Sequence, residues 1–215
     1  MDASPGLLYP GRRVPEPGCG LISDSRNHSC DLRVCHGSTP DAPNTPQPLQ
    51  TGTAIILFAD IVDSTALTEQ LGDSVFRGRS SQLDAAMRAG IRDCGGTPID
   101  GKVLGDGVMA VFSSAREAIA AAFHCEASAD GTGLALRLGI HAGDVIREAD
   151  NVYGGAVNIA ARVSTLAAPG EVLVSDVVRS LGRTSSGVTF EDRGEHALKG
   201  VGEPVRVYAV RRTEG

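Results

Sequence analysis

The chain has 215 residues and a mass of 22.2 kDa, a length that allows one domain, or one domain with a tail. Hydrophobic residues make up 41% and charged residues 21%, which excludes a wholly disordered chain. The net charge of −6 and the pI near 5.3 argue against a protein that binds nucleic acid through bulk positive charge. Because aromatic residues contribute only 4%, the core is expected to be aliphatic.

Proline is distributed unevenly, with eight of the eleven prolines in the first 48 residues. Proline interrupts helices and central strands, and no apolar period emerges there, so residues 1–50 are predicted to be a disordered tail. The tail lacks the apolar segment of a secretory signal, and the longest later apolar run, 54–59, is too short to span a bilayer. We therefore expect a cytoplasmic protein without a membrane partner.

Three of the five cysteines lie in this tail, in a C-x10-C-x4-C-H spacing that matches no common zinc pattern. Free thiols are the favoured interpretation and a zinc site the less favoured one. Cys94 and Cys125 fall in helical patterns and are predicted to be small core residues.

Residues 51–212 carry the periodicities of regular structure. Strands are predicted from buried or alternating apolar runs, and helices from apolar residues spaced three or four apart. In chain order the expected elements are strand 53–60, helices 64–71 and 80–94, strands 97–103 and 108–112, helix 114–127, strand 135–141, helix 157–166, and strands 171–174 and 205–210. This order predicts an α+β fold with a ferredoxin-like βαββαβ core and additional αβ elements.

Two aspartates are expected to meet at one end of the sheet. Asp60 ends the first strand, and Asp106 lies in Gly105-Asp106-Gly107, the expected hairpin turn of a neighbouring strand. Adjacent carboxylates repel each other unless a cation lies between them, and hard oxygen ligands favour Mg²⁺ or Mn²⁺. Taken singly, a helix cap and a turn residue are the simpler explanations for these two positions.

Further polar residues point to phosphate chemistry. Asn158 and Arg162 are four residues apart on a predicted helix and share one face, an arrangement suited to a charged phosphorus centre. Lys199 lies in a glycine-containing turn that could bring a cation to terminal phosphates, and Lys102 could donate to a base edge. A strand-to-helix passage with backbone amides that could face a triphosphate is formed by Ile61, Val62, Asp63, Ser64 and Thr65.

Together these residues resemble the catalytic domain of class III nucleotidyl cyclases, of the bacterial adenylate cyclase type. The resemblance covers about residues 53–211. It is carried by the segments ILFADIVDST, GKVLGDGVMAVF, LRLGIHAGDV, VYGGAVNIAARV and RGEHALKGVGEPVRVYAV. Residues 51–212 are therefore expected to be the catalytic domain.

The resemblance implies a head-to-tail homodimer that converts ATP to 3′,5′-cyclic AMP and pyrophosphate at two shared sites. Two divalent ions, Mg²⁺ or Mn²⁺, would be held by the carboxylates of Asp60 and Asp106 and the carbonyl of Ile61. Asn158 and Arg162 of the partner chain would stabilise the transition state. Lys199 would bind the β- and γ-phosphates, and Lys102 would recognise adenine.

One position departs from the adenylate cyclase pattern. Many of these enzymes carry an Asp seven residues before the helix Asn, where this chain has Asn151. An Asn carbonyl can accept from an adenine amino group, but its NH₂ can also face a guanine carbonyl. A guanylate or mixed-purine cyclase therefore stays open, as does a non-catalytic nucleotide-binding or dimerisation module. The chain has no GG[DE]EF-like turn of a diguanylate cyclase.

Overall fold

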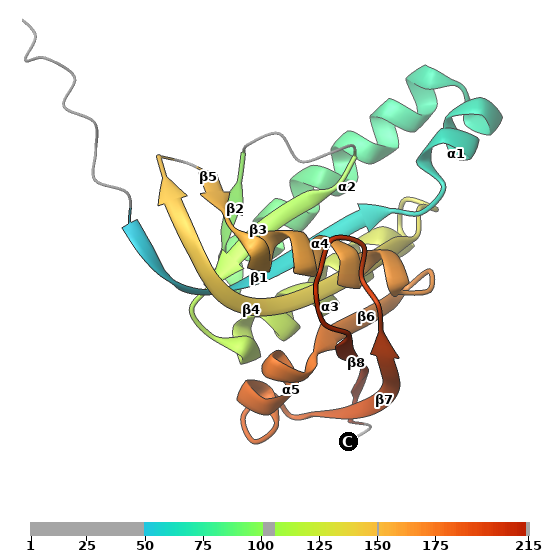
Figure 1. The fold of residues 1–215 in the computed structure, drawn as a ribbon. Coiled ribbons are helices and arrows are strands. Elements are labelled where there is room, and N and C mark those ends of the chain that lie inside the picture. Colours follow the sequence, from blue (N-terminus) through green and yellow to red (C-terminus); the bar gives the residue numbers. More distant parts are fainter. Residues whose placement is uncertain (1–49, 101–105, 150, 214–215) are drawn as a thin grey trace, which may run out of the picture. The chain divides into compact units, whose positions relative to one another are not determined.

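The computed structural model describes residues 50–100, 106–149 and 151–213, all of which belong to one compact unit, Thr45–Gly215. The predicted tail, residues 1–50, lies outside the described residues except for its last position. Five helices and eight strands are present in the described ranges (Figure 1). They are β1 (Gln50–Ile61), α1 (Ser64–Leu71), α2 (Asp73–Asp93), β2 (Thr97–Ile99), β3 (Val108–Phe112), α3 (Ala115–Asp130), β4 (Leu136–Glu148), β5 (Asn151–Tyr153), α4 (Gly155–Leu166), β6 (Glu171–Ser175), α5 (Asp176–Gly182), β7 (Val188–His196) and β8 (Val205–Arg212).

The strands form one sheet in the order β2-β3-β1-β4-β6-β8-β7, with β5 paired to β4. The pairs β1–β3, β1–β4 and β2–β3 are antiparallel, whereas β4 and β6 run parallel. The first four of these strands, together with α2 and α3, make the predicted βαββαβ arrangement. The α+β, ferredoxin-like prediction is confirmed, and the additional elements are α1, β5, α4, β6, α5, β7 and β8.

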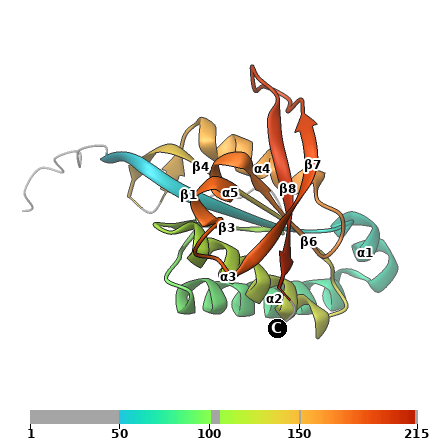
Figure 2. The same ribbon diagram turned by 90° about the horizontal axis from the view of Figure 1, so that it is seen from below.

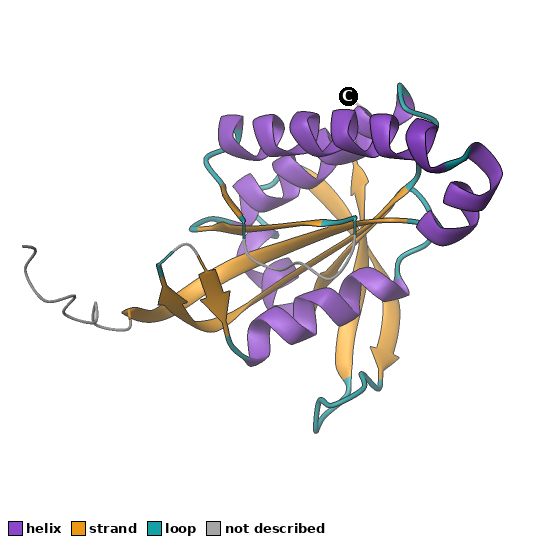
Figure 3. Ribbon diagram, turned by 90° about the horizontal axis from the view of Figure 1, so that it is seen from above, coloured by secondary structure: helices purple, strands orange, loops and turns teal. Residues whose placement is uncertain are grey.

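Helices cover both faces of the sheet, α2 and α3 on one side and α4 on the other (Figure 3). Successive side chains of a strand point to opposite faces, and β1 shows both directions. Leu57 and Ala59 join the cluster under α2 and α3, whereas Ala54 and Ile56 join the cluster under α4. Because both faces are buried, the middle of this strand is apolar without interruption.

Helix α4 lies unusually close to β4. A Cβ atom added to Gly139 would collide with the backbone nitrogen of Ser164, and one added to Gly143 would lie 2.9 Å from the Cβ of Ala156. The two glycines therefore let the helix rest on the strand backbone, with its N-terminal part over Gly143 and its C-terminal part over Gly139.

Several elements are longer than the sequence pattern predicts. The helix predicted to begin at Ser80 begins at Asp73. Its first turns were missed because Phe76 is their only buried residue, so they show no apolar period. The strand expected to end at His141 continues to Glu148, where it pairs with the start of β1 and with β5. The strand predicted to reach Val103 is shorter, since β2 ends at Ile99 and Asp100 is not part of a strand; residues 101–105 lie outside the described residues.

Strands β7 and β8 form a ribbon whose connecting loop lies on the same side of the sheet as α4 (Figure 2). Strand β7 and helix α5 were not predicted, because most of the side chains of β7 are exposed and α5 has only seven residues. Among the described helices, none is long and apolar enough to cross a membrane.

Candidate functional site

Asp60 lies at the end of β1 and forms an ion pair with β4. Its Cα partner in the sheet is Arg137, whose Nη2 donates to Asp60 Oδ2 at 2.9 Å. The Asp60 side chain is 36% exposed and that of Arg137 29% exposed, so both remain open to a solute. The Nε of Arg137 is buried and has no hydrogen-bond partner among the described residues.

The start of β3 brings Asp106 beside Asp60. Ala59 pairs with Val108, which places Gly107 directly against the end of β1. A Cβ atom on Gly107 would lie 2.6 Å from the Ala59 carbonyl oxygen and 3.4 Å from Asp60 Oδ1. Only glycine allows this approach, and the exposed Asp106 precedes it directly in the chain. The predicted turn, Gly105-Asp106-Gly107, falls partly outside the described residues, and the last described pair of the β2–β3 ladder is Ile99 with Met109.

The segment from Ile61 to Thr65 turns the chain from β1 into α1. The Val62 amide donates to the Ala135 carbonyl at 2.9 Å and is therefore committed within the chain. Asp63 adopts a left-handed conformation, with φ 52° and ψ 36°, and its side chain does not cap the helix. Within the described ranges, the amides of Asp63, Ser64 and Thr65 make no hydrogen bond of good geometry to a backbone carbonyl, as is usual for the first turn of a helix.

The end of β1, the start of α1 and Arg137 line an open pocket of about 430 Å³, whose lining does not include Asp106. Sequence reasoning did not single out two of its charged residues, Arg137 and Glu69. A signal for Arg137 existed, since a charged residue alternates there with Leu136 and Leu138 in a strand whose other face is buried. The lining residues are Asp60, Ile61, Asp63, Ser64, Thr65, Ala66, Glu69 and Arg137.

A second group of predicted residues lies on and beside α4. Asn158 and Arg162 are exposed and one turn apart, on the helix face opposite the buried Ala156 and Ala160. Lys199 is exposed in the loop between β7 and β8. Neither the two α4 residues nor Lys199 lines the pocket around Asp60.

The neighbour of Lys199 explains how its loop is held. Leu198 is 6% exposed and packs in a cluster that includes Val163 and Ala167 at the end of α4. This contact attaches the loop that carries Lys199 to the helix that carries Asn158 and Arg162. One chain therefore presents two separate groups of candidate residues.

Two further residues, Lys102 and Asn151, were predicted to contact the purine. Lys102 lies outside the described residues. Asn151 begins β5, is partly buried and pairs with Glu148 of β4. Asn151 does not line the pocket around Asp60.

Oxygen ligands for a cation are present, but one chain does not complete a metal site from side chains alone. In residues 50–100, 106–149 and 151–213, no group of three or more His, Cys, Asp or Glu side chains could hold a metal ion. Mg²⁺ commonly binds through one or two carboxylates, with water and substrate phosphates filling the remaining positions. The Asp60 carboxylate in an open pocket fits this mode of binding, and the exposed Asp106 precedes the glycine that contacts Asp60.

A polar pair lies on the α4 side of the sheet. His141 Nδ1 and Ser175 Oγ are 2.8 Å apart and share a hydrogen bond between β4 and β6. Burial lowers the pKa of His141 below its ordinary value of 6.5, because the charged imidazolium loses solvation there. We infer a neutral imidazole at this position at neutral pH.

Known proteins match this chain over the same part of the sequence. The family described as the adenylate and guanylate cyclase catalytic domain matches residues 47–212. A relative from Rhizobium meliloti (strain 1021) is 34% identical over 115 residues, which are 50% of this chain and 20% of that protein. A pH-sensitive adenylate cyclase of Mycobacterium tuberculosis (strain CDC 1551 / Oshkosh) is 31% identical over 163 residues, 73% of this chain and 40% of that protein. The chain thus spans only part of these relatives.

Solved structures agree with the fold. The adenylyl cyclase CyaB from P. aeruginosa is 25% identical with a TM-score of 0.67, covering 78% of this chain and 97% of that one. An adenylate/guanylate cyclase/hydrolase from Silicibacter pomeroyi is 26% identical with a TM-score of 0.69, covering 77% of this chain and 100% of that one. With its motifs, its sheet order and its matched residues in agreement, the chain belongs to the class III adenylate and guanylate cyclase catalytic-domain family.

Proposed function

We propose that the chain is an adenylate cyclase that converts ATP to 3′,5′-cyclic AMP and pyrophosphate. The observation that supports this most directly is the contact of Gly107 with the end of β1, which brings the Asp106 and Asp60 positions close together at the start of the loop into α1. The reaction forms a bond between the ribose 3′ oxygen and the α-phosphorus, breaks the bond to the β-phosphate oxygen and releases pyrophosphate. We assign residues 51–212 as the catalytic domain and residues 1–50 as a separate tail.

One half of the site would bind the triphosphate. Asp60, Asp106 and the Ile61 carbonyl would hold two divalent ions, Mg²⁺ or Mn²⁺. When bound, these ions would favour loss of the 3′-OH proton and offset the charge of the triphosphate. The amides of Asp63, Ser64 and Thr65 would donate to phosphate oxygens at the start of α1. A cation bound to the Asp60 carboxylate would replace the ion pair between Asp60 and Arg137. The Arg137 guanidinium would then contact the phosphates.

The other half would come from a second copy of the chain, in a head-to-tail homodimer. Asn158 and Arg162 would stabilise the charge that develops at the α-phosphorus, and Lys199 would hold the β- and γ-phosphates. Two observations favour a shared site. These three residues are exposed, and they lie outside the pocket around Asp60 of their own chain. A two-fold dimer would pair each group with its complement and form two equal sites.

Purine selectivity rests on two positions. Lys102 favours adenine in this proposal, whereas the amide of Asn151 suits either an adenine amino group or a guanine carbonyl. A guanylate or mixed-purine cyclase is therefore the second candidate function. The two functions are separated by giving purified protein equal concentrations of ATP and GTP with Mn²⁺. A strong preference for ATP would exclude the guanylate or mixed-purine cyclase, and cyclic GMP as the main product would exclude the adenylate cyclase.

Catalysis itself is tested with Asp60→Ala. Wild-type protein with ATP and Mn²⁺ should form cyclic AMP, and Asp60→Ala should form none. A wild type no more active than this variant would leave the non-catalytic nucleotide-binding or dimerisation module as the function. Asp84→Asn, which removes an ion pair with Arg88 on α2, is a matched control that should retain activity.

The shared site has its own test. Asp60→Ala and Arg162→Ala proteins are each expected to be inactive, and a mixture should regain activity because each heterodimer contains one intact site. Specific activity of the wild type should also fall on dilution towards the dimer dissociation constant. A mixture that stays inactive while heterodimers demonstrably form would refute the shared site.

A further inference from the structure

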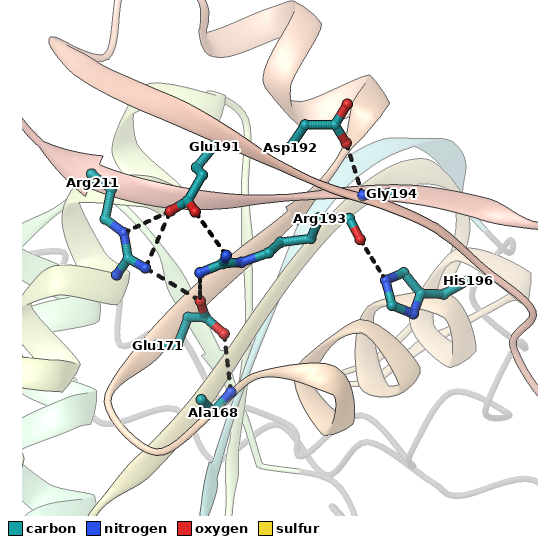
Figure 4. Close-up of polar contacts among 8 residues, drawn as sticks. All are labelled: Ala168, Glu171, Glu191, Asp192, Arg193, Gly194, His196 and Arg211. Carbon is teal, nitrogen blue, oxygen red and sulfur yellow. Dashed lines mark hydrogen bonds and ion pairs between the residues drawn. The ribbon is translucent and has the colours of Figure 1, made fainter.

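Four charged side chains form a closed ring between β6, β7 and β8 (Figure 4). Arg193 bridges the two glutamates, with Nη2 at 2.8 Å from Glu171 Oε1 and Nη1 at 2.8 Å from Glu191 Oε1. Arg211 bridges them again, with Nε at 3.3 Å from Glu191 Oε2 and Nη2 at 3.5 Å from Glu171 Oε1. We refer to Glu171, Glu191, Arg193 and Arg211 as the charge ring.

Glu171 is the least exposed member of the charge ring, with a side chain only 12% exposed, compared with 36% for Arg193 and about half for the other two. Its Oε2 accepts a hydrogen bond from the Ala168 amide at 3.1 Å, two residues beyond the end of α4. Burial on its own would raise the pKa of Glu171, but the Ala168 N–H and the Arg193 guanidinium outweigh it and hold the pKa below its ordinary value. The carboxylate is thus stabilised in its charged form by groups from two different segments.

Arg193 projects from an irregular part of β7. The pairing with β8 shifts register between Asp192 and Glu195, as in a β-bulge. The Gly194 amide donates to Asp192 Oδ1 at 2.8 Å, and His196 Nε2 lies 2.9 Å from the Arg193 carbonyl oxygen. These local bonds fix the backbone of the bulge and so the point from which Arg193 reaches Glu171.

The charge ring joins the two parts that carry the second half of the proposed site. At one end, the Ala168 amide follows α4, which carries Asn158 and Arg162. At the other end, Arg193 belongs to the ribbon whose loop carries Lys199. Among the described strands, β7 pairs with β8 alone, and β8 pairs with β6 over just three residue pairs. The ribbon therefore depends on contacts outside the sheet for its placement relative to α4.

We propose that Glu171 is a positioning residue, which holds the β7–β8 ribbon against the end of α4 so that Lys199 keeps one placement relative to Arg162. This inference rests on the proposed function, because it assigns a consequence to Lys199 and Arg162. The hydrophobic contact of Leu198 fixes the loop against α4, and the charge ring fixes the base of the ribbon. Surface ion pairs contribute little in general, but the Glu171 side chain is only 12% exposed and uses one carboxylate oxygen for the Ala168 amide and the other for Arg193. A glutamine has a single acceptor oxygen and no charge, so it cannot keep both contacts.

The test compares Glu171→Gln with wild type in two measurements. Hydrogen exchange of the backbone amides in residues 197–204 should become faster, while exchange in β1 and β4 stays unchanged. The KM for ATP should rise about tenfold with little change in kcat, the loss expected when a charge-assisted contact to phosphate weakens. Arg193→Lys keeps the charge but not the forked geometry and should give a smaller change in both measurements.

A double-mutant cycle separates positioning from general damage. Added to Lys199→Ala, Glu171→Gln should raise KM no further, because the group that it positions is already absent. The control Asp84→Asn should leave both measurements at wild-type values. Should Glu171→Gln fail to fold, Arg211→Gln replaces it in the same cycle.

The outcomes keep the two proposals apart. Unchanged exchange in residues 197–204, or an effect on KM that adds fully to that of Lys199→Ala, overturns the positioning role. If the wild type makes no cyclic nucleotide, the proposed function fails, and the exchange measurement alone decides whether Glu171 holds the ribbon.

Discussion

Gly107 offers the sharpest test of how the two aspartates are brought together. The substitution Gly107→Ala adds one methyl group at the point where β3 meets the end of β1. That methyl carbon would start 2.6 Å from the Ala59 carbonyl oxygen and 3.4 Å from Asp60 Oδ1. The nearest atom belongs to the backbone and cannot rotate away, so the start of β3 must move outward, taking Asp106 with it.

The expected cost follows from the size of that movement. Overpacking of this kind typically lowers the free energy of unfolding by about 1–3 kcal/mol. A displacement approaching 1 Å between groups that act together typically costs about 100-fold in activity. Because Asp106 and Asp60 are proposed to hold the same cations, Gly107→Ala should also weaken Mn²⁺ binding.

Three assays measure these effects: urea unfolding, calorimetric titration with Mn²⁺, and cyclic AMP formation from ATP. Gly78→Ala is the matched control, since Gly78 lies inside α2 with no atom within 4 Å of the added methyl group. This control should raise the free energy of unfolding by up to about 1 kcal/mol through helix propensity and leave activity unchanged. A Gly107→Ala protein as stable and as active as wild type would refute the close approach described here.

Three other residues give further predictions. Asp63→Ala should lower the free energy of unfolding by about 1 kcal/mol, whereas Asp63→Gly should be nearly neutral, because Asp63 is left-handed and alanine tolerates that conformation poorly; equal urea midpoints for the two variants would contradict this. The lowered pKa of His141 makes its contribution to stability complete above about pH 6.5 and progressively smaller as the pH falls towards the folded-state pKa. The melting temperature of wild type should therefore drop more between pH 7.5 and 5 than that of His141→Gln, and parallel curves would count against this reasoning. Burial raises the pKa of Cys125 to about 12, so iodoacetamide at pH 8 should modify this thiol only after denaturation, as peptide mass spectrometry can show.

The core of the fold was predictable because its elements are buried and their periods are visible. Strand β1 alternates between two buried faces, and helix α3 repeats apolar residues at helical spacing, so both were identified within a few residues of their ends. The start of α2, the whole of α5 and strand β7 were not predicted. In β7, for example, only Val188 and Phe190 pack partly against the core, and the remaining residues give no alternating apolar signal.

The candidate site was predictable as a set of residue types but not as an arrangement. Asp60 and the loop after it were identified from their place at the end of a buried strand, and the structure gathers them around one pocket. Arg137 was not identified, because its alternation with Leu136 and Leu138 marks an unusual charge but its partner Asp60 follows only from the register between β1 and β4. The charge ring also depends on residues far apart in the sequence, such as Glu171 and Arg193, and on a bulge that only the register reveals.

The outer strands of the sheet limit how a second chain can approach. Strand β2 has three residues and contains Pro98, which has no N–H to donate, and β7 at the opposite end of the strand order carries a bulge and a row of charged side chains. Neither strand is a good template for adding another strand. Joining of two sheets through β2 or β7 is therefore disfavoured, which fits the proposed association through the surfaces that carry α4 and Lys199.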